Sequence, residues 1–410
     1  MKMLATVGKN LSVKKKNTKK LKSKRKDSVV DRNVGKETSH NTDSAVGAAT
    51  GCAFTKLELS KPLHHSVISA IAALGFERTT PVQQATIPLL LSNKDVAVQA
   101  QTGSGKTAAF LIPAFDLLLR SEEAWRPHDV GCIIIAPTRE LSSQIFAVAQ
   151  SMSPHIPEII VLSLTGGSDQ VEAMREFQER GGNLVIATPG RLEHTMESES
   201  RFNVKRLELL VLDEADRLLD MGFQACLNSI LARLPKQRRT GLFSATMNTE
   251  VTALARAGLR NPRLVKVTVK GANLKQQATP LTLTNDYMIC TPDQKLNQLV
   301  CFLGEHCEDK CMVYLLTCAH VDYFAALLPL LPNLSGANIM SLHGKMVQKR
   351  RSKTYEKFLS CPKGILLCTD VAARGLDIPD VDWIVQYDAP QVLTHRYSFL
   401  FNSFQRIVGL

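Results

Sequence analysis

One glycine-rich segment has the composition of a phosphate-binding loop, and it reads Ala100-Gln101-Thr102-Gly103-Ser104-Gly105-Lys106-Thr107. It fits the pattern G-x-x-x-x-G-K-[ST] if the first glycine is relaxed to alanine. Glycines let the backbone bend sharply, so that its N–H groups converge on phosphate oxygens. Lys106 supplies a positive charge for the β- and γ-phosphates, and Thr107 supplies a hydroxyl for Mg²⁺. On this motif alone, an ordinary glycine turn is the alternative.

A second segment carries paired acidic residues, Asp213-Glu214-Ala215-Asp216, directly after the apolar run 209–212. Open α/β sheets place their ligand sites at the carboxyl ends of strands. One carboxylate there can hold Mg²⁺ through water, and the next can polarise the water that attacks a γ-phosphate. Acidic residues after a strand are also common in surface turns. Together with the upstream loop, however, they predict nucleotide hydrolysis.

At this point the sequence resembles the DEAD-box ATP-dependent RNA helicases, over roughly residues 54 to 390. The acidic segment is the motif that names the family. Thr80-Pro81-Val82-Gln83, after Gly75-Phe76, resembles the family's Q motif, and Phe54 resembles the aromatic residue that precedes it. Ser244-Ala245-Thr246 resembles the motif that couples hydrolysis to strand separation. The resemblance implies ATP and Mg²⁺ as cofactors and RNA as the partner.

The resemblance also assigns roles on the nucleotide side. The implied catalytic residues are Lys106, Asp213, Glu214, Ser244 and Thr246, with Glu214 orienting the attacking water. The implied nucleotide-binding residues are Phe54, Gln83, Ala100, Gln101, Thr102, Gly103, Ser104, Gly105, Lys106, Thr107 and Asp377, and Thr107 and Asp213 would hold Mg²⁺ through water. The amide of Gln83 can donate to and accept from one base edge, which suits adenine. Phe54 could stack on adenine, or it could belong to the core.

Several further motifs resemble the family's RNA-contacting segments. They comprise Pro137, Thr138, Arg139, Gly166, Gly167, Thr188, Pro189, Gly190 and Arg191 in the first half and Arg351, Thr369, Asp370 and Gly375 in the second. Arg139 and Arg191 each begin an expected helix, where a basic side chain favours phosphate. Such contacts hold sugar and phosphate and carry little sequence information. Ordinary helix capping by the two threonines is the alternative and can coexist with RNA binding.

Hydrophobic patterning predicts an α/β fold with two parallel-sheet domains in tandem. The resemblance implies that both are RecA-like and that the second is truncated at its C-terminus. Apolar runs of strand length alternate with helix-length segments, which is typical of parallel sheets covered on both faces. The expected strands are 96–99, 132–136, 159–164, 184–187, 209–212 and 242–244, then 312–316, 339–342, 365–368 and 383–386. The expected domains are a tail at 1–50, domain 1 at 51–269, a linker at 270–285 and domain 2 at 286–410.

Charge is concentrated at the N-terminus. The chain has 50 Lys and Arg against 38 Asp and Glu, for a net charge of +12, and residues 1–26 hold eleven of the basic residues and no acidic one. Such a segment cannot bury enough apolar surface to order itself. It favours targeting to the nucleus, and specifically the nucleolus, together with weak RNA attraction. A mitochondrial presequence is the rival, which the lysine enrichment disfavours.

Two function classes are disfavoured by the sequence. The chain has no apolar run of 18 or more residues, so no membrane association is expected. Its ten cysteines are scattered, which indicates reduced thiols and not a disulfide scaffold. Cys301, His306, Cys307 and Cys311 cluster loosely, but their spacing is poor for zinc.

The sequence departs from the family where the core should carry His-Arg-x-Gly-Arg-x-x-Arg. It keeps His395-Arg396 and then reads Tyr397-Ser398-Phe399-Leu400-Phe401, without the glycine and the two later arginines. Either the reading frame is truncated or mis-joined, or the chain is a short isoform that has lost turnover. An impaired protein that binds RNA and nucleotide without turnover is therefore the alternative function. The stretch 212–246 resembles helicases of large-ribosomal-subunit assembly, so the expected partners are rRNA precursors and pre-ribosomal proteins.

Overall fold

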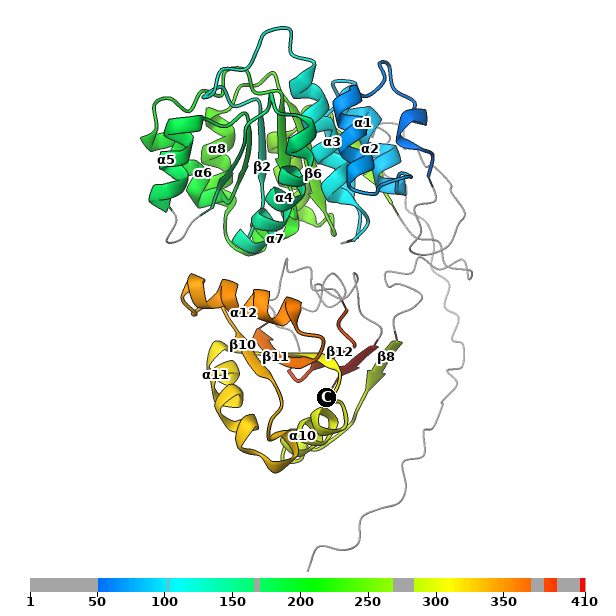
Figure 1. The fold of residues 1–410 in the computed structure, drawn as a ribbon, viewed down its shortest axis with the longest axis vertical. Coiled ribbons are helices and arrows are strands. Elements are labelled where there is room, and N and C mark those ends of the chain that lie inside the picture. Colours follow the sequence, from blue (N-terminus) through cyan, green and yellow to red (C-terminus); the bar gives the residue numbers. More distant parts are fainter. Residues whose placement is uncertain are drawn as a thin grey trace, which may run out of the picture. The chain divides into compact units, whose positions relative to one another are not determined.

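The computed structural model describes residues 51–101, 103–165, 170–267, 284–369, 380–388 and 406–409. These residues form two parallel sheets, one of seven strands and one of six, each with its own helices (Figure 1). The expected tail at 1–50 and most of the expected linker lie outside the described residues. Within the described residues, no helix combines the length and apolarity that crossing a bilayer requires.

The first sheet has the strand order β3-β4-β2-β5-β6-β1-β7, and all neighbouring strands are parallel. Its strands are β1 (Val96–Gln99), β2 (Cys132–Ile135), β3 (Val161–Leu164), β4 (Leu184–Ala187), β5 (Leu209–Leu212), β6 (Arg239–Ser244) and β7 (Arg263–Lys266). The central strands β2, β4 and β5 are buried along their whole length. Burial on both faces explains their uninterrupted apolar sequence, because parallel sheets are covered by helices on both sides.

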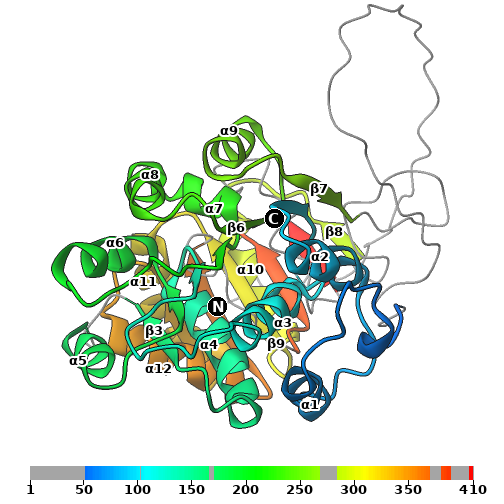
Figure 2. The same cartoon turned by 90° about the horizontal axis from the view of Figure 1, so that it is seen from above.

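Helices cover both faces of this sheet, and Figure 2 shows α6 to α9 along one side and α1, α3 and α4 along the other. Val96 and Val98 pack with the α1, α3 and α4 side, whereas Ala97 packs with the α6 to α9 side. Successive strand residues point to opposite faces, so one strand serves both cores. The helices are α1 (His65–Ala73), α2 (Pro81–Leu91), α3 (Lys106–Leu119), α4 (Arg139–Met152), α5 (Gln170–Arg180), α6 (Pro189–Ser198), α7 (Ala215–Asp220), α8 (Gln224–Arg233) and α9 (Thr249–Gly258).

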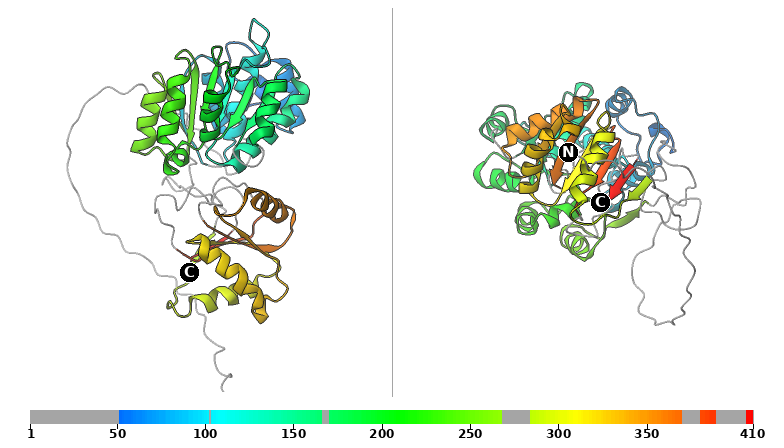
Figure 3. Two further views of the ribbon diagram at one scale, coloured as in Figure 1. Left: turned by 90° about the vertical axis from the view of Figure 1, so that its left-hand side faces the viewer. Right: turned by 90° about the horizontal axis from the view of Figure 1, so that it is seen from below.

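The second sheet has the strand order β10-β11-β9-β12-β13-β8, again with parallel neighbours. Buried residues of α10 and α11 pack on one face, and Phe358 of α12 packs on the other (Figure 3, yellow and orange helices). The strands are β8 (Thr284–Tyr287), β9 (Lys310–Leu315), β10 (Ile339–Leu342), β11 (Gly364–Thr369), β12 (Trp383–Gln386) and β13 (Arg406–Gly409). The helices are α10 (Lys295–Glu305), α11 (Cys318–Leu327) and α12 (Gln348–Ser360).

Every strand expected from an apolar run is present, with small shifts at its ends. Three strands, β7, β8 and β13, were not expected. β8 begins at Thr284, so the expected linker extends two residues too far. The sequence of β8, Thr-Asn-Asp-Tyr, has no apolar run, because this strand lies at the edge of its sheet and pairs only with β13 among the described strands.

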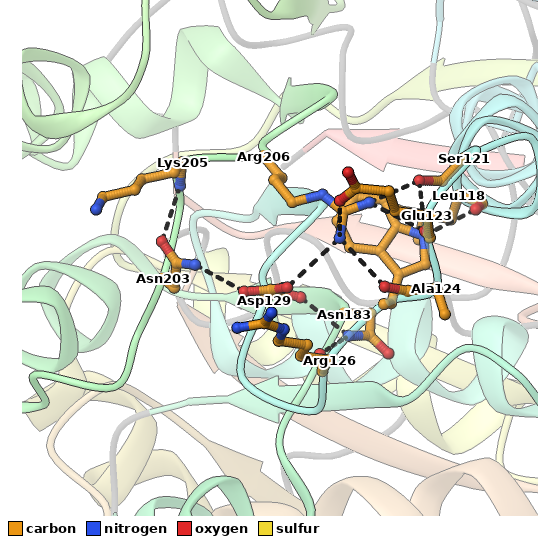
Figure 4. Close-up of polar contacts among 11 residues, drawn as sticks. Leu118, Ser121, Glu123, Ala124, Arg126, Asp129, Asn183, Asn203, Lys205 and Arg206 are labelled. Carbon is orange, nitrogen blue, oxygen red and sulfur yellow. Dashed lines mark hydrogen bonds and ion pairs between the residues drawn. The ribbon is translucent and has the colours of Figure 1, made fainter.

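The connection between α3 and β2 is fixed by Arg206, which comes from the segment before β5 (Figure 4). Its guanidinium lies 4.4 Å from the centre of the Trp125 ring, a cation–π distance. Its Nη2 donates to Ser121 Oγ at 2.8 Å and to the carbonyl of Glu123 at 3.0 Å. Trp125 Nε1 in turn donates to the carbonyl of Leu118 in α3 at 2.8 Å. One arginine therefore holds a loop more than 80 residues away in sequence.

Candidate nucleotide and RNA site

The motifs of the first sheet follow the carboxyl ends of neighbouring strands. The phosphate loop follows β1, the acidic segment follows β5, and Ser244 ends β6, and these three strands are adjacent in the sheet. The segments expected to contact RNA follow β2, β3 and β4, which are also adjacent. Carboxyl ends of parallel strands meet at one edge, where such sheets bind ligands. Among the described residues, those expected to bind nucleotide therefore lie at one half of that edge, and those expected to contact RNA lie at the other.

The phosphate loop is shaped by Gly105, the residue that precedes α3. Gly105 has φ 88, and a Cβ atom there would lie 2.6 Å from Nε2 of Gln83. Its left-handed backbone conformation therefore favours glycine, and a Cβ atom would displace the Gln83 amide. Ser104 Oγ donates to the carbonyl of Gln101 at 2.7 Å and tightens the loop.

Lys106 lies at the first position of α3, and its side chain turns back into the loop. The residue is only 7% exposed, and its Nζ donates to the carbonyl of Ala100 at 2.9 Å. A buried ammonium that donates to one backbone carbonyl has further donors for phosphate oxygens. The helix N-terminus adds its own preference for an anion at this position.

Gln83 connects the Q motif to this loop. Its Oε1 accepts from the backbone N–H of Thr80 at 2.9 Å, while Nε2 donates to the carbonyl of Gly105 at 3.1 Å. Thr80 and Gln83 thus form a capping box at the start of α2. The structure places Gln83 at the phosphate loop with both ends of its amide engaged by backbone groups. Its contact with adenine stays a prediction.

Phe54 lies in a short 3₁₀ helix, Phe54–Lys56, and is 5% exposed. It packs into the same core as α1, α2 and α3. Of the two roles considered for it, the core role is observed, and stacking on adenine stays a prediction. The chain between Phe54 and α1 is attached to α3 by Asp116, whose Oδ1 accepts from the backbone N–H of His64 at 2.7 Å.

The acidic segment is buried, and Asp213 is 3% exposed. Burial raises the pKa of the Asp213 carboxyl to about 7, although the neighbouring charge of Lys106 opposes the shift. Its Oδ1 accepts from the backbone N–H of Glu214 at 3.0 Å. A buried carboxylate that is costly to ionise alone is suited to a site that a cation completes.

Glu214 adopts a left-handed backbone conformation, with φ 47 and ψ 55, as α7 begins. Its carboxylate Oε2 accepts from Nη1 of Arg217 at 2.7 Å. The side chains of Glu214 and Arg217 are only 10% and 9% exposed, so this ion pair is largely shielded from water. Arg217 was not among the residues expected from the sequence, although acid and base three residues apart face each other on a helix.

Asp216 joins the acidic segment to the end of β6. Its Oδ2 accepts from both the backbone N–H and the Oγ1 of Thr246, at 3.0 and 2.9 Å. The backbone N–H of Asp216 donates to Ser244 Oγ at 3.3 Å, and the Ser244 carbonyl accepts from the N–H of Ala100 at 3.1 Å. Continuous hydrogen bonds therefore run from the acidic segment through Ser244 to the phosphate loop. Asp216 was quoted in the motif but assigned no role from the sequence.

On the RNA side, the two threonines behave differently. Thr138 caps α4, because its Oγ1 accepts from the backbone N–H of Leu141 at 3.3 Å. Thr188 occupies the corresponding position before α6 but makes no such hydrogen bond. The capping alternative is therefore correct for Thr138 and wrong for Thr188. Arg191, in the first turn of α6, is 8% exposed, and burial lowers the pKa of its guanidinium, which still stays charged.

The remaining expected residues lie in the second sheet's domain, in the first sheet's domain, or outside the described residues. Thr369 ends β11 and is 5% exposed, and Arg351 lies in α12. Pro189 and Gly190 open α6, and Pro137 follows β2. The residues outside the described ranges are Thr102, Gly166, Gly167, Asp370, Gly375, Asp377 and the segment 391–401.

Comparison with known families now identifies the chain. A family model described as DEAD/DEAH box helicase matches residues 80–254, and one described as helicase conserved C-terminal domain matches residues 294–406. The chain belongs to the DEAD-box helicase family. The matched ranges contain strands β1 to β6 and β9 to β12 in full, and the first residue of β13. Strands β7 and β8 lie outside the matched ranges.

Similar proteins include the ATP-dependent RNA helicase DDX55 of Gallus gallus, which is 52% identical over 334 residues, and the DEAD-box ATP-dependent RNA helicase 18 of Oryza sativa subsp. japonica, which is 51% identical over 351 residues. These matches cover 80% and 83% of this chain but only 56% and 54% of the relatives. The chain thus spans about half the length of the curated relatives it matches.

Solved structures show the same fold. The DEAD-box helicase Mss116, in a structure bound to single-stranded RNA and UDP-BeF, is 30% identical and has a TM-score of 0.75. That match covers 84% of this chain and 73% of the other. Two RecA-like parallel-sheet domains in tandem, expected from the apolar runs and the motif resemblance, are therefore confirmed.

The residues that the structure brings together fit a nucleotide with its Mg²⁺. The glycine-shaped loop and the buried Lys106 provide donors for phosphate, and the buried Asp213 carboxyl lacks a cationic side chain in direct contact among the described residues. The hydroxyl of Thr107 and the Asp213 carboxylate are the groups that would hold Mg²⁺. When bound, the ion neutralises charge that develops on the phosphates.

Proposed function

We propose that this protein is an ATP-dependent RNA helicase, which couples ATP hydrolysis to RNA unwinding or to the remodelling of RNA–protein complexes. The observation that carries the proposal is the hydrogen-bonded connection on three adjacent strands. It runs from the acidic segment through Asp216, Thr246 and Ser244 to the phosphate loop. Such a connection can report the loss of a γ-phosphate to neighbouring strands. The relatives named as ATP-dependent RNA helicases support the same activity.

The chain's own residues divide the work in this proposal. Lys106 binds the β- and γ-phosphates through its buried ammonium, and Glu214 orients the attacking water and accepts hydrogen bonds from it. Loss of the γ-phosphate changes the contacts at the phosphate loop. The link through Ser244 and Thr246 then carries that change toward β2, β3 and β4. Arg139 and Arg191 hold RNA by its backbone, so the protein acts on RNA without reading its sequence.

The biological setting is a further part of the proposal. The resemblance of residues 212–246 to helicases of large-ribosomal-subunit assembly supports a role in ribosome biogenesis and rRNA processing, with rRNA precursors and pre-ribosomal proteins as partners. The basic stretch in residues 1–26 supports delivery to the nucleus and nucleolus. ATP and Mg²⁺ are the proposed cofactors.

The test is RNA-stimulated ATP hydrolysis, with two variants that separate binding from chemistry. Lys106→Ala should lose nucleotide binding and hydrolysis while it keeps the fold, because Lys106 contacts the loop and not the apolar core. Glu214→Gln should keep nucleotide and RNA binding but lose hydrolysis, because an amide cannot act as a carboxylate base. Hydrolysis by Lys106→Ala within a few-fold of the parent would contradict the assignment of the phosphate loop.

A second candidate function is supported by residues 397–401, which depart from the family's arginine motif. In this candidate the chain binds nucleotide and RNA with little turnover, since an arginine that contacts the transferred phosphate contributes roughly 10³–10⁵ in rate. Replacing the residues after Arg396 with a segment that carries Gly-Arg-x-x-Arg decides between the two. If the replacement raises the ATP hydrolysis rate about a thousandfold, the parent chain is the binding protein with little turnover. If the rate is unchanged, the parent chain is the helicase, and a different arginine contacts the transferred phosphate.

A further inference from the structure

The proposed function leaves one buried ion pair beside the reacting groups without a role. Arg217 Nη1 donates to Oε2 of Glu214 at 2.7 Å, and both side chains are about nine-tenths buried. Building on the proposed function, we propose that Arg217 is a positioning residue for ATP hydrolysis. It fixes the carboxylate of Glu214 in the orientation from which that carboxylate aligns the attacking water.

Glu214 needs such a restraint because its side chain has three rotatable bonds and several accessible rotamers. A general base acts only within about 2.6–3.2 Å of the proton that it accepts. A charge-assisted hydrogen bond to one carboxylate oxygen, shielded from water, selects one of those rotamers before substrate arrives. The short distance and the burial of both partners are what this role requires.

The backbone around the pair strengthens the argument. Glu214 has φ 47, a left-handed conformation that residues other than glycine seldom adopt. Strained residues of this kind persist where the surrounding structure holds them, and they concentrate at functional sites. The contact to Arg217 spans the first turn of α7, so it restrains the side chain of Glu214 at the residue whose backbone is left-handed.

Arg217 also connects Glu214 to the residue that contacts Thr246. The backbone N–H of Arg217 donates to Oδ1 of Asp216 at 3.1 Å, while its side chain binds Glu214. The other oxygen of Asp216 accepts from Thr246. A displacement of Thr246 is therefore transmitted to the base through one turn of helix.

A simple stabilising role is the competing explanation. Buried ion pairs often stabilise a fold little more than apolar residues of the same size, because both charges lose water. A side chain present only for packing would therefore be replaceable by methionine with little effect on catalysis. The two explanations differ in which kinetic quantities change, since positioning lowers kcat alone and packing lowers kcat and the affinities for ATP and RNA together.

The test compares Arg217→Met, which keeps the length and removes the charge, with Arg217→Lys, which keeps the charge. Single-turnover hydrolysis of radiolabelled ATP, with RNA at saturation, measures the rate constant of hydrolysis even when it is small. We expect Arg217→Met to lower the rate by on the order of 10²-fold, the effect of misplacing a reacting group by about 1 Å. The KM for ATP and the Kd for RNA should stay within about threefold. Arg217→Lys should recover at least a tenth of the parent rate, because it restores a charged donor.

The matched control is Arg233→Met, which removes an exposed ion pair to Glu197 at the end of α8. It should leave all three quantities unchanged. A rate for Arg217→Met within threefold of the parent would overturn the proposal. So would a loss of ATP and RNA affinity as large as the loss of rate, because that result indicates a packing role.

A thermal double-mutant cycle tests the contact without any hydrolysis. Trp125 reports on the first sheet when Trp383, the other tryptophan, is replaced by phenylalanine. Arg217→Met should lower the unfolding midpoint by roughly 5–10 °C, and it should do so much less when Glu214 is already alanine. Additive shifts would overturn the proposal. A parent that binds nucleotide but never hydrolyses it would contradict the proposed function, while this cycle would still decide whether Arg217 holds Glu214.

Discussion

Replacing Asp116 by alanine tests how the segment that carries Phe54 is attached to the phosphate-loop helix. Asp116 lies in α3 and is fully buried. Its Oδ1 accepts from the backbone N–H of His64 at 2.7 Å, and its Oδ2 pairs with Nε of Arg120. Arg120 Nη2 also donates to the carbonyl of Pro62 at 2.7 Å. One carboxylate and one guanidinium therefore fasten the chain before α1 to the far end of α3.

The expected cost follows from these contacts. Without the carboxylate, the partly buried N–H of His64 loses its acceptor, which costs about 1–3 kcal/mol. Arg120 loses its partner as well, but its side chain is 27% exposed, so water compensates and we assign about 1 kcal/mol to that loss. A total of about 3 kcal/mol lowers the unfolding midpoint by roughly 6–12 °C for a domain of this size. Nucleotide affinity should fall too, if Phe54 contacts adenine.

The assay is the fluorescence of Trp125 during thermal unfolding, in the Trp383→Phe background that isolates the first sheet. Asp116→Asn keeps an acceptor for His64 and loses the charge, so its shift should be smaller. The matched control is Glu179→Ala, which removes an exposed i,i+4 pair with Arg175 and should cost no more than about 0.5 kcal/mol. A midpoint for Asp116→Ala within 2 °C of the parent would refute this account of the attachment.

Three further predictions follow from other parts of the chain. Arg206→Met should lower the thermal unfolding midpoint of the first sheet's domain by several degrees, since it removes hydrogen bonds to the α3–β2 loop. Lys205→Met should leave that midpoint unchanged. Circular dichroism measures both midpoints, and equal shifts would contradict the role of Arg206. Hydrogen bonds from Arg201 and Gln178 lower the pKa of Glu199 to about 2, so its stabilising contribution is present above pH 4.5 and is lost as the pH falls toward 2; urea unfolding of Glu199→Gln should show a weaker loss over that interval, and parallel pH curves would argue against it. Deleting residues 1–26 should reduce the salt dependence of RNA binding without changing the maximal ATPase rate, and an unchanged salt slope would show that these residues do not contact RNA.

The sequence allowed the convergence of the phosphate loop and the acidic segment to be predicted because both motifs follow apolar strands. The carboxyl ends of such strands meet at one sheet edge whatever the details of packing. Strand β7 could not be found in this way, because only Val265 of its four residues is buried. Strand β8 is polar and is defined by its partner β13, which lies about 120 residues later in the sequence. Edge strands depend on neighbours that a local pattern does not contain.

The side-chain contacts at the site were harder to predict from the sequence than the places of the motifs along the sheet edge. The amide of Gln83 was expected at a base edge, yet it binds backbone groups of Thr80 and Gly105. The pairing of Arg217 with Glu214 depends on a left-handed turn at Glu214, and propensity rules give no reason to expect that turn in a glutamate. Contacts of this kind are set by tertiary structure, which overrides the local preferences of the chain.

The strand order of the first sheet also limits where the protein can change. The strands that precede the segments expected to contact RNA, β3, β4 and β2, lie together, and those that precede the expected nucleotide motifs, β5, β6 and β1, lie together. Under the proposed function, RNA preferences can therefore change by substitution at the ends of β3 and β4 without disturbing the phosphate loop. Substitutions at the β2–β5 boundary affect both ligands at once, so we expect sequence variation to be smallest there. Under the proposed function, this arrangement allows RNA targets to change while the site proposed for ATP stays the same.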